Sequence, residues 1–261
     1  MKKLVIASLL AALCATASAD NIQPQQIREG QLDLIYPVVT VVNPAAQGKI
    51  NTDILLRVNR IKGQYKSGDL NGAFMDYATV YEDDNALEMR LDLRTLHGKR
   101  GSHSHYWSEG MTYDKHTGDL VMQREHFLND DHELDFVYPQ VFLANPEAEA
   151  AINKDIDRRM ARLKRQYENR DLYRAYMYYE LTGLTPDTIT MVIYTRTLRN
   201  NGHERGEFEN WDTEITYDRK TGAILSEDKS AIYNDERRRL DERVNRPARP
   251  RNYGGTTNRI S

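Results

Sequence analysis

Apolar residues recur along this chain with two different periods, which follow each other in a fixed order. Residues 34–42 are apolar and β-branched, as in a strand, and Asn43 followed by Pro44 is a typical helix start. The helix is predicted to run to about Tyr65, with Gly68 ending it, because apolar residues recur every three or four positions. This apolar stripe consists of Ile50, Ile54, Val58, Ile61 and Tyr65.

Strict alternation of apolar and polar residues then predicts four strands. It is clear at residues 75–81 and 87–95, and two further strands are expected at about 104–114 and 119–125. The last two flank Asp114-Lys115-His116-Thr117-Gly118, a hairpin signal in which the Asp carboxylate caps the turn and Gly supplies a positive φ. The order predicts an α+β unit whose helix packs on one face of an antiparallel sheet.

The whole unit occurs twice. The text from Tyr36 to Leu96 returns 102 residues later without a gap, and the hairpin motif returns 104 residues later. Matching pairs include Tyr36-Pro37 with Tyr138-Pro139, Asn43-Pro44 with Asn145-Pro146, and Ile50-Asn51 with Ile152-Asn153. A domain-sized period predicts two tandem copies of the strand-helix-four-strand unit rather than a solenoid. We assign the two repeat units to residues 32–128 and 134–233.

The N-terminal residues have the order of a secretory signal. Met1-Lys2-Lys3 is followed by an apolar run to Leu13 and by Ala17-Ser18-Ala19, so residues 1–19 are predicted to be a signal peptide. The protein is therefore expected in the periplasm or outside the cell. Cys14, the single cysteine, lies in this segment, which leaves no thiol for disulfides or metal sites. No later stretch is long and apolar enough to predict a transmembrane anchor.

Charge is distributed unevenly. Residues 20–233 contain 26 basic and 35 acidic residues, a net charge of about −9, whereas residues 234–261 contain eight Arg and four acidic residues. An acidic body argues against nucleic-acid binding and suits a cationic partner, although a solubilising surface explains it equally well. We expect residues 20–31 to be a flexible leader and residues 234–261 a disordered Arg-rich tail. Two roles are open for the tail, which could contact anionic cell-wall polymer or simply keep the chain end solvated.

Aromatic residues are the main candidates for binding. Exposed Trp and Tyr often anchor protein or sugar partners, and packing in the core is the alternative for each of them. The predicted binding residues are Trp107, Trp211, His103, Tyr113 and Tyr217. Arg94 and Arg196 occupy matching positions on polar strand faces, where cross-strand charge pairs are expected.

Two chemical alternatives remain open. His103 and His105 share one strand face, and with His97 or His116 they could bind Zn or Cu. The acidic pairs at residues 83–84 and 130–131 leave a glycan hydrolase possible. The chain has no Gly-x-Ser-x-Gly elbow and no phosphate-binding Gly-rich loop, so no cofactor is predicted.

The repeated motifs also resemble a known family. Tyr-Pro before an Asn-Pro-capped helix with Ile-Asn-x-x-Ile, then Tyr-Asp-x-x-Thr-Gly, is similar to a bacterial extracytoplasmic family of unknown function. That family occurs in lysozyme-sensing anti-sigma factors of the RsiV type and beside the catalytic domain of peptidoglycan deacetylases of the PdaC type. The resemblance implies an α+β fold, work at the cell envelope and, through the anti-sigma relatives, lysozyme binding.

These observations together predict an exported, non-enzymatic binding module of the cell envelope. Its expected partner is a lysozyme-like muramidase or another envelope protein. A periplasmic metal-binding protein using the His103 and His105 pair is the first alternative, and a cell-wall glycan hydrolase is the second.

Overall fold

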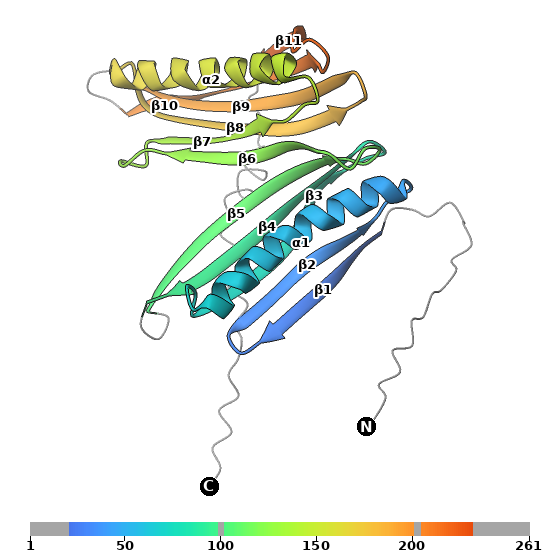
Figure 1. Ribbon diagram of the computed structural model, residues 1–261. Helices are drawn as coiled ribbons and strands as arrows, with labels where there is room; N and C mark the ends of the chain where they lie inside the picture. The colour runs from blue at the N-terminus through green and yellow to red at the C-terminus, as the bar shows by residue number, and fades with distance from the viewer. Residues whose placement is uncertain (1–20, 99–101, 201–204, 232–261) are drawn as a thin grey trace, which may run out of the picture.

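The computed structural model describes residues 21–98, 102–200 and 205–231, which form eleven strands and two helices (Figure 1). The elements of the first half are β1 (Asn21–Glu29), β2 (Leu32–Thr40), α1 (Pro44–Ser67), β3 (Gly72–Glu82), β4 (Ala86–His97), β5 (His103–Asp114) and β6 (Leu120–Leu128). Those of the second half are β7 (Leu134–Val141), α2 (Pro146–Glu168), β8 (Leu172–Leu184), β9 (Thr188–Asn200), β10 (Arg205–Asp218) and β11 (Ile224–Ala231). The predicted signal peptide and Arg-rich tail lie outside the described residues.

The predicted architecture of two tandem helix-packed four-strand units is wrong. All eleven strands form one mixed sheet, in which they lie in sequence order from β1 to β11. The two repeats share this sheet because β6 pairs antiparallel with β7 along residues 122–128 and 135–141. The sheet is mixed because each helix connects two parallel strands, β2 to β3 and β7 to β8. Period-two patterning identifies strands but not the neighbours of each strand, so the sequence did not reveal this assembly.

Residues 21–29 form a strand where the sequence predicts a flexible leader. β1 pairs antiparallel with β2 along its whole length, from Asn21 opposite Thr40 to Glu29 opposite Leu32. Gly30 makes the tight turn between them with a φ of +59°. β1 is polar because it is an edge strand that is mostly exposed. Ladder hydrogen bonds to β2 therefore order a segment whose composition alone indicates disorder.

The helix starts and stripes predicted from the sequence are confirmed. The side chain of Asn43 accepts a hydrogen bond from the N–H of Ala45 at 3.0 Å, and Asn145 accepts one from Glu147 at 3.0 Å. Gly68 ends α1 in the left-handed conformation. The four aliphatic residues of the α1 stripe are buried against the first half of the sheet and Tyr65 is partly buried, while α2 covers a second core (Figure 1). No helix in the described residues is long and apolar enough to cross a membrane.

An asparagine in each helix is hydrogen-bonded to the backbone of the preceding strand. The N–H of Val39 donates to Asn51 Oδ1, and Asn51 Nδ2 donates to the carbonyl of Val39, both at 2.8 Å. Asn153 makes the same two bonds with Val141 at 2.9 Å. β3 pairs with β2 only along residues 32–34, so the amide of Asn51 supplies partners that a neighbouring strand does not provide.

A buried polar network joins each helix to the strand before the hairpin. Tyr113 donates to Asp53 Oδ2 at 2.6 Å, and Tyr217 donates to Asp155 Oδ2 at 2.9 Å. In the second repeat Arg159 completes the network, with ion pairs of 2.7 Å to Asp155 and 3.0 Å to Glu227 of β11. Burial, reinforced by the neighbouring carboxylate, raises the pKa of both tyrosines far above its usual range.

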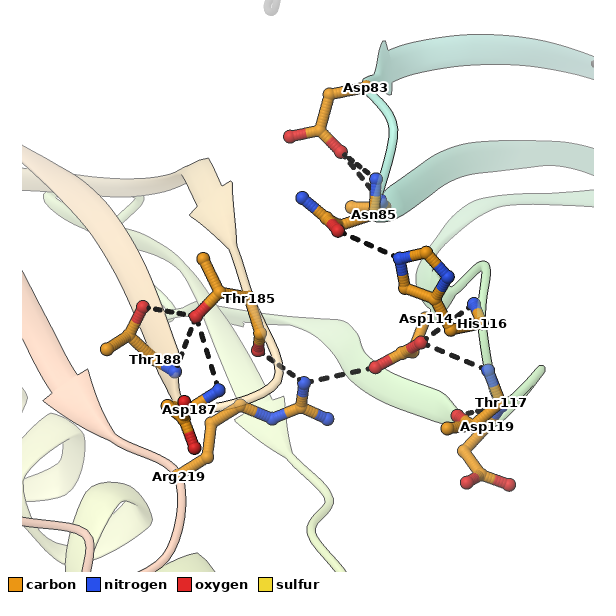
Figure 2. A network of polar contacts seen from close by, with 11 residues as sticks. Asp83, Asn85, Asp114, His116, Thr117, Asp119, Thr185, Asp187, Thr188 and Arg219 are labelled. Carbon is orange, nitrogen blue, oxygen red and sulfur yellow. Dashed lines mark hydrogen bonds and ion pairs between the residues drawn. The ribbon is translucent and has the colours of Figure 1, made fainter. Parts of the chain in front are cut away.

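The hairpin prediction is also confirmed, and the two hairpin turns meet (Figure 2). Asp114 Oδ1 accepts from the N–H groups of His116 and Thr117 at 2.9 and 3.1 Å, and Gly118 has a φ of +73°. From the second copy of the motif, Arg219 donates to Asp114 Oδ2 at 3.0 Å and to the carbonyl of Thr185 at 2.6 Å. Arg219 therefore links the hairpin of one repeat to that of the other.

Replacing Arg219 is expected to destabilise the protein strongly. Arg219→Ala leaves the buried Asp114 carboxylate without its cation, and the free energy of unfolding should fall by about 3 kcal/mol in urea denaturation. Lys220→Ala is the matched control, because Lys220 lies next in the same turn and its ion pair with Asp187 is solvent-exposed. Equal stabilities of the two variants would contradict the role of Arg219.

Stability is expected to depend on pH through Asp155. Burial raises the pKa of this carboxyl, but hydrogen bonds from Arg159 and Tyr217 and the nearby guanidinium charges outweigh burial and leave the pKa below its usual value. A depressed folded-state pKa stabilises the fold above about pH 4, and this contribution is lost as pH falls through the folded-state pKa. The difference in unfolding free energy between wild type and Asp155→Asn should therefore shrink on acidification. A difference that stays constant from pH 7 to pH 3 would contradict the assignment.

Candidate binding surface

The outer half of β5 is the most exposed regular strand segment that carries predicted site residues. All six residues from His103 to Ser108 are exposed, whereas the last five residues of the strand, 110–114, are buried. Tyr106 is 68% exposed and Trp107 is 40% exposed, although both are large aromatic residues. Figure 1 shows that β5 and β6 run apart from their shared hairpin, and β6 pairs only with residues 111–113 of β5.

Trp107 lies on the face of the sheet that α1 covers. It is opposite Leu93 of β4, and Leu93 belongs to the buried core under α1. Trp107 lines a small crevice with Arg57, Arg60, Ile61, Met75, Leu91, Leu93 and Glu109. Within the crevice Arg57 forms an ion pair with Glu109, so the indole stands beside a charge pair and the guanidinium of Arg60. Such an amphipathic site suits the binding of a protein side chain.

On the opposite face, Arg94 is placed between two aromatic rings. Its guanidinium lies 5.3 Å from the ring centroid of Phe74 and 5.5 Å from that of Tyr106. The second repeat has a related contact, with Arg196 at 3.8 Å from the ring centroid of Phe208. The cross-strand charge pair predicted for Arg94 is thus replaced by stacking, because the residue directly opposite it on β5 is Tyr106. Sequence reasoning missed Tyr106 and Phe74, since only the register brings them to Arg94.

Three of the four histidines considered as metal ligands, His97, His103 and His105, lie near the β4–β5 turn, whereas His116 lies in the β5–β6 turn and is hydrogen-bonded to Asn85 at 2.9 Å. His103 lies opposite His97, and the rings of His97 and His105 meet edge to face at 4.9 Å. His97 is hydrogen-bonded to Thr95 at 2.8 Å, and His103 to Ser102 at 3.0 Å. Within the described residues, no group of three or more His, Cys, Asp or Glu side chains is arranged to hold a metal ion.

Three predicted site residues lie elsewhere. Tyr113 and Tyr217 are fully buried in the two cores, where they donate hydrogen bonds to Asp53 and Asp155, so neither side chain lies on the surface of this fold. Trp211 belongs to the second repeat and is half-buried, and β11 covers its strand edge with Ala231 opposite it. Of the five predicted binding residues, only His103 and Trp107 share the exposed half of β5.

The carboxylates considered for hydrolysis have structural roles where their contacts are described. Asp83 accepts hydrogen bonds from the N–H groups of Asn85 and Ala86 at 2.8 and 2.6 Å, and from Tyr81 at 2.7 Å. It therefore caps the turn between β3 and β4 (Figure 2). The sequence did not single out Glu88, which is 2% exposed and pairs with Arg124 at 2.6 Å. Burial raises the pKa of Glu88, and the Arg124 charge opposes this effect.

Comparisons with known proteins leave the family open. No protein-family model matches the chain, and no curated protein matches it. The resemblance to the extracytoplasmic family therefore stays a prediction from short motifs.

The different exposure of the two tryptophans can be measured. In single-tryptophan proteins, Trp107 (in Trp211→Phe) should be quenched more strongly by acrylamide than Trp211 (in Trp107→Phe), with emission at longer wavelength. The reason is that β11 shields the strand edge at Trp211, whereas β6 does not reach Trp107. Stronger quenching of Trp211 would contradict the assignment of the surface to β5.

Proposed function

We propose that this protein is a non-enzymatic binding module of the cell envelope that binds another protein through the outer half of β5. The observation that carries the proposal is the run of six exposed residues that includes Tyr106 and Trp107. Large aromatic side chains beside arginines are the residues that most often dominate protein interfaces. Trp107 with Arg60, and Tyr106 with Arg94, provide this combination on the two faces of one strand.

The proposed setting is extracytoplasmic. It rests on the order of charged, apolar and small residues in the first nineteen positions, which is typical of a secretory signal. The proposed partner is a lysozyme-like muramidase, which the motif resemblance suggests. The net charge of about −9 over residues 20–233 supports a cationic partner, because opposite charges accelerate association.

A calorimetric titration of residues 20–261 with a lysozyme tests the function, at low and at physiological salt. Saturable binding that persists at physiological salt is expected. The reason is that salt screens the buried contacts made by Tyr106 and Trp107 less than it screens attraction between exposed charges. Heat that disappears with salt would instead mean charge attraction alone.

Paired variants test the location of the surface. Tyr106→Ala combined with Trp107→Ala should weaken lysozyme binding by at least about tenfold, since truncation of central aromatic residues removes most of the affinity of an interface. Tyr173→Ala is the control, because Tyr173 is exposed to a similar degree but lies on β8. Unchanged affinity in the double variant would place the interface elsewhere.

A further inference from the structure

One edge of β5 lacks a neighbouring strand over most of its length. β5 pairs with β4 along all twelve of its residues, from Asp114 to His103. On its other edge β6 pairs only with residues 111–113 and then leaves to pair with β7. Residues 103–110 therefore present backbone N–H and C=O groups on an edge that no strand in the described part of the chain covers.

The second repeat shows the same edge in a covered state. β10 is the counterpart of β5, and β11 pairs with it from Tyr217 to Trp211. With the offset of 104 residues, positions 211–214 of β10 correspond to positions 107–110 of β5. An antiparallel strand thus lies beside these positions in one repeat and is missing in the other. The reason is that β11 is the last strand of the sheet, whereas β6 pairs with β7.

A side-chain contact accompanies the divergence of β6. A Cβ at Gly110 would lie 2.6 Å from Cδ of Arg124, so the Arg124 stem crosses closely over the β5 backbone at this glycine. The guanidinium then pairs with Glu88 of β4 and lies 4.9 Å from the ring centroid of Tyr178 of β8. These contacts hold Arg124 between the two halves of the sheet, at the point where β6 leaves β5.

We infer that residues 103–110 of β5 bind an extended segment of the partner protein as an added antiparallel strand. This inference rests on the proposed binding function and specifies its mode. An uncovered strand edge is a template for strand addition, in which main-chain hydrogen bonds supply affinity and alternate side chains supply specificity. The segment occupies in the first repeat the place that β11 occupies in the second.

The neighbouring side chains define the chemistry of the segment. On the α1 side, the added strand passes Trp107 and the exposed guanidinium of Arg60, for which the described residues contain no ion-pair partner. In the second repeat Glu227 of β11 pairs with Arg159 of α2. The counterpart of Arg159 in the first repeat is Arg57, which already pairs with Glu109, so we assign the carboxylate of the added segment to Arg60. The α1 side of the segment is therefore expected to carry a carboxylate side chain. Apolar side chains are assigned to the other side, against Tyr106.

A peptide with the sequence of residues 228–235, Asp-Lys-Ser-Ala-Ile-Tyr-Asn-Asp, is a suitable probe. Residues 228–231 pair with the positions of β10 that correspond to residues 107–110 of β5, and in the same register the other four residues of the peptide lie opposite residues 103–106. In the Trp211→Phe protein, millimolar peptide should change the Trp107 emission saturably. Amide hydrogen exchange should slow by at least about fivefold at alternate residues of 103–110, because ladder bonds form at every second residue of one edge.

Backbone methylation separates strand addition from side-chain docking. Two further peptides carry N-methyl groups at the odd or at the even positions. One of them should lose binding and the other should keep it, because a strand donates hydrogen bonds to one neighbour through alternate residues. Equal binding of both methylated peptides, or no slowing of exchange at residues 103–110 with the unmodified peptide, overturns the inference.

This test does not depend on the identity of the partner. In one outcome lysozyme binds, but neither lysozyme nor the peptide slows amide hydrogen exchange at residues 103–110. This result supports the binding function and overturns strand addition. Protection by the unmodified peptide, with the expected response to methylation and without lysozyme binding, supports strand addition and rejects lysozyme as the partner.

Discussion

Backbone hydrogen bonding at the strand edges is the constraint on which this structure depends. Each strand carries N–H and C=O groups on both edges, and buried groups of this kind must find partners. At Val39 and Val141 the partners are the side chains of Asn51 and Asn153 rather than another strand. At the boundary between the repeats, β6 and β7 pair with each other, and this pairing joins two similar units in one sheet.

The duplication places one motif in two environments, and comparison of the copies shows what each environment changes. Lys115 and Arg219 hold matching positions in the hairpin turns, and each donates to the matching backbone carbonyl, of Asp83 and of Thr185. Arg219 also reaches Asp114 of the first repeat (Figure 2). The strands before the two hairpins also differ. β11 covers the outer edge of β10 in the second repeat, whereas β6 covers only residues 111–113 of β5 in the first. The second copy therefore acts as the internal reference for the first.

The proposed binding surface follows from this asymmetry. β6 pairs only with the hairpin end of β5 and then turns away. β5 is therefore buried at its hairpin end and exposed at its start. The exposed part carries Trp107 beside Arg60 on one face and Tyr106 beside Arg94 on the other. The buried tyrosines at the other end, Tyr113 and Tyr217, join helix to sheet through Asp53 and Asp155. The proposed binding residues of β5 thus lie in its exposed half, and its structural tyrosine lies at its buried end.

The sequence by itself determined the local elements. Asn43 with Pro44 starts α1, the apolar stripe orients it, and Asp114 with Gly118 shapes the hairpin, because each of these signals acts within a few residues. Only the tertiary structure decided how strand edges pair, which turned the polar residues 21–29 into a strand and joined both repeats in one sheet. It also decided that Tyr113 is buried and Trp107 exposed. The two residues are six positions apart and share a strand face, so period-two patterning treats them alike. Their difference arises from where the neighbouring β6 ends its pairing with β5.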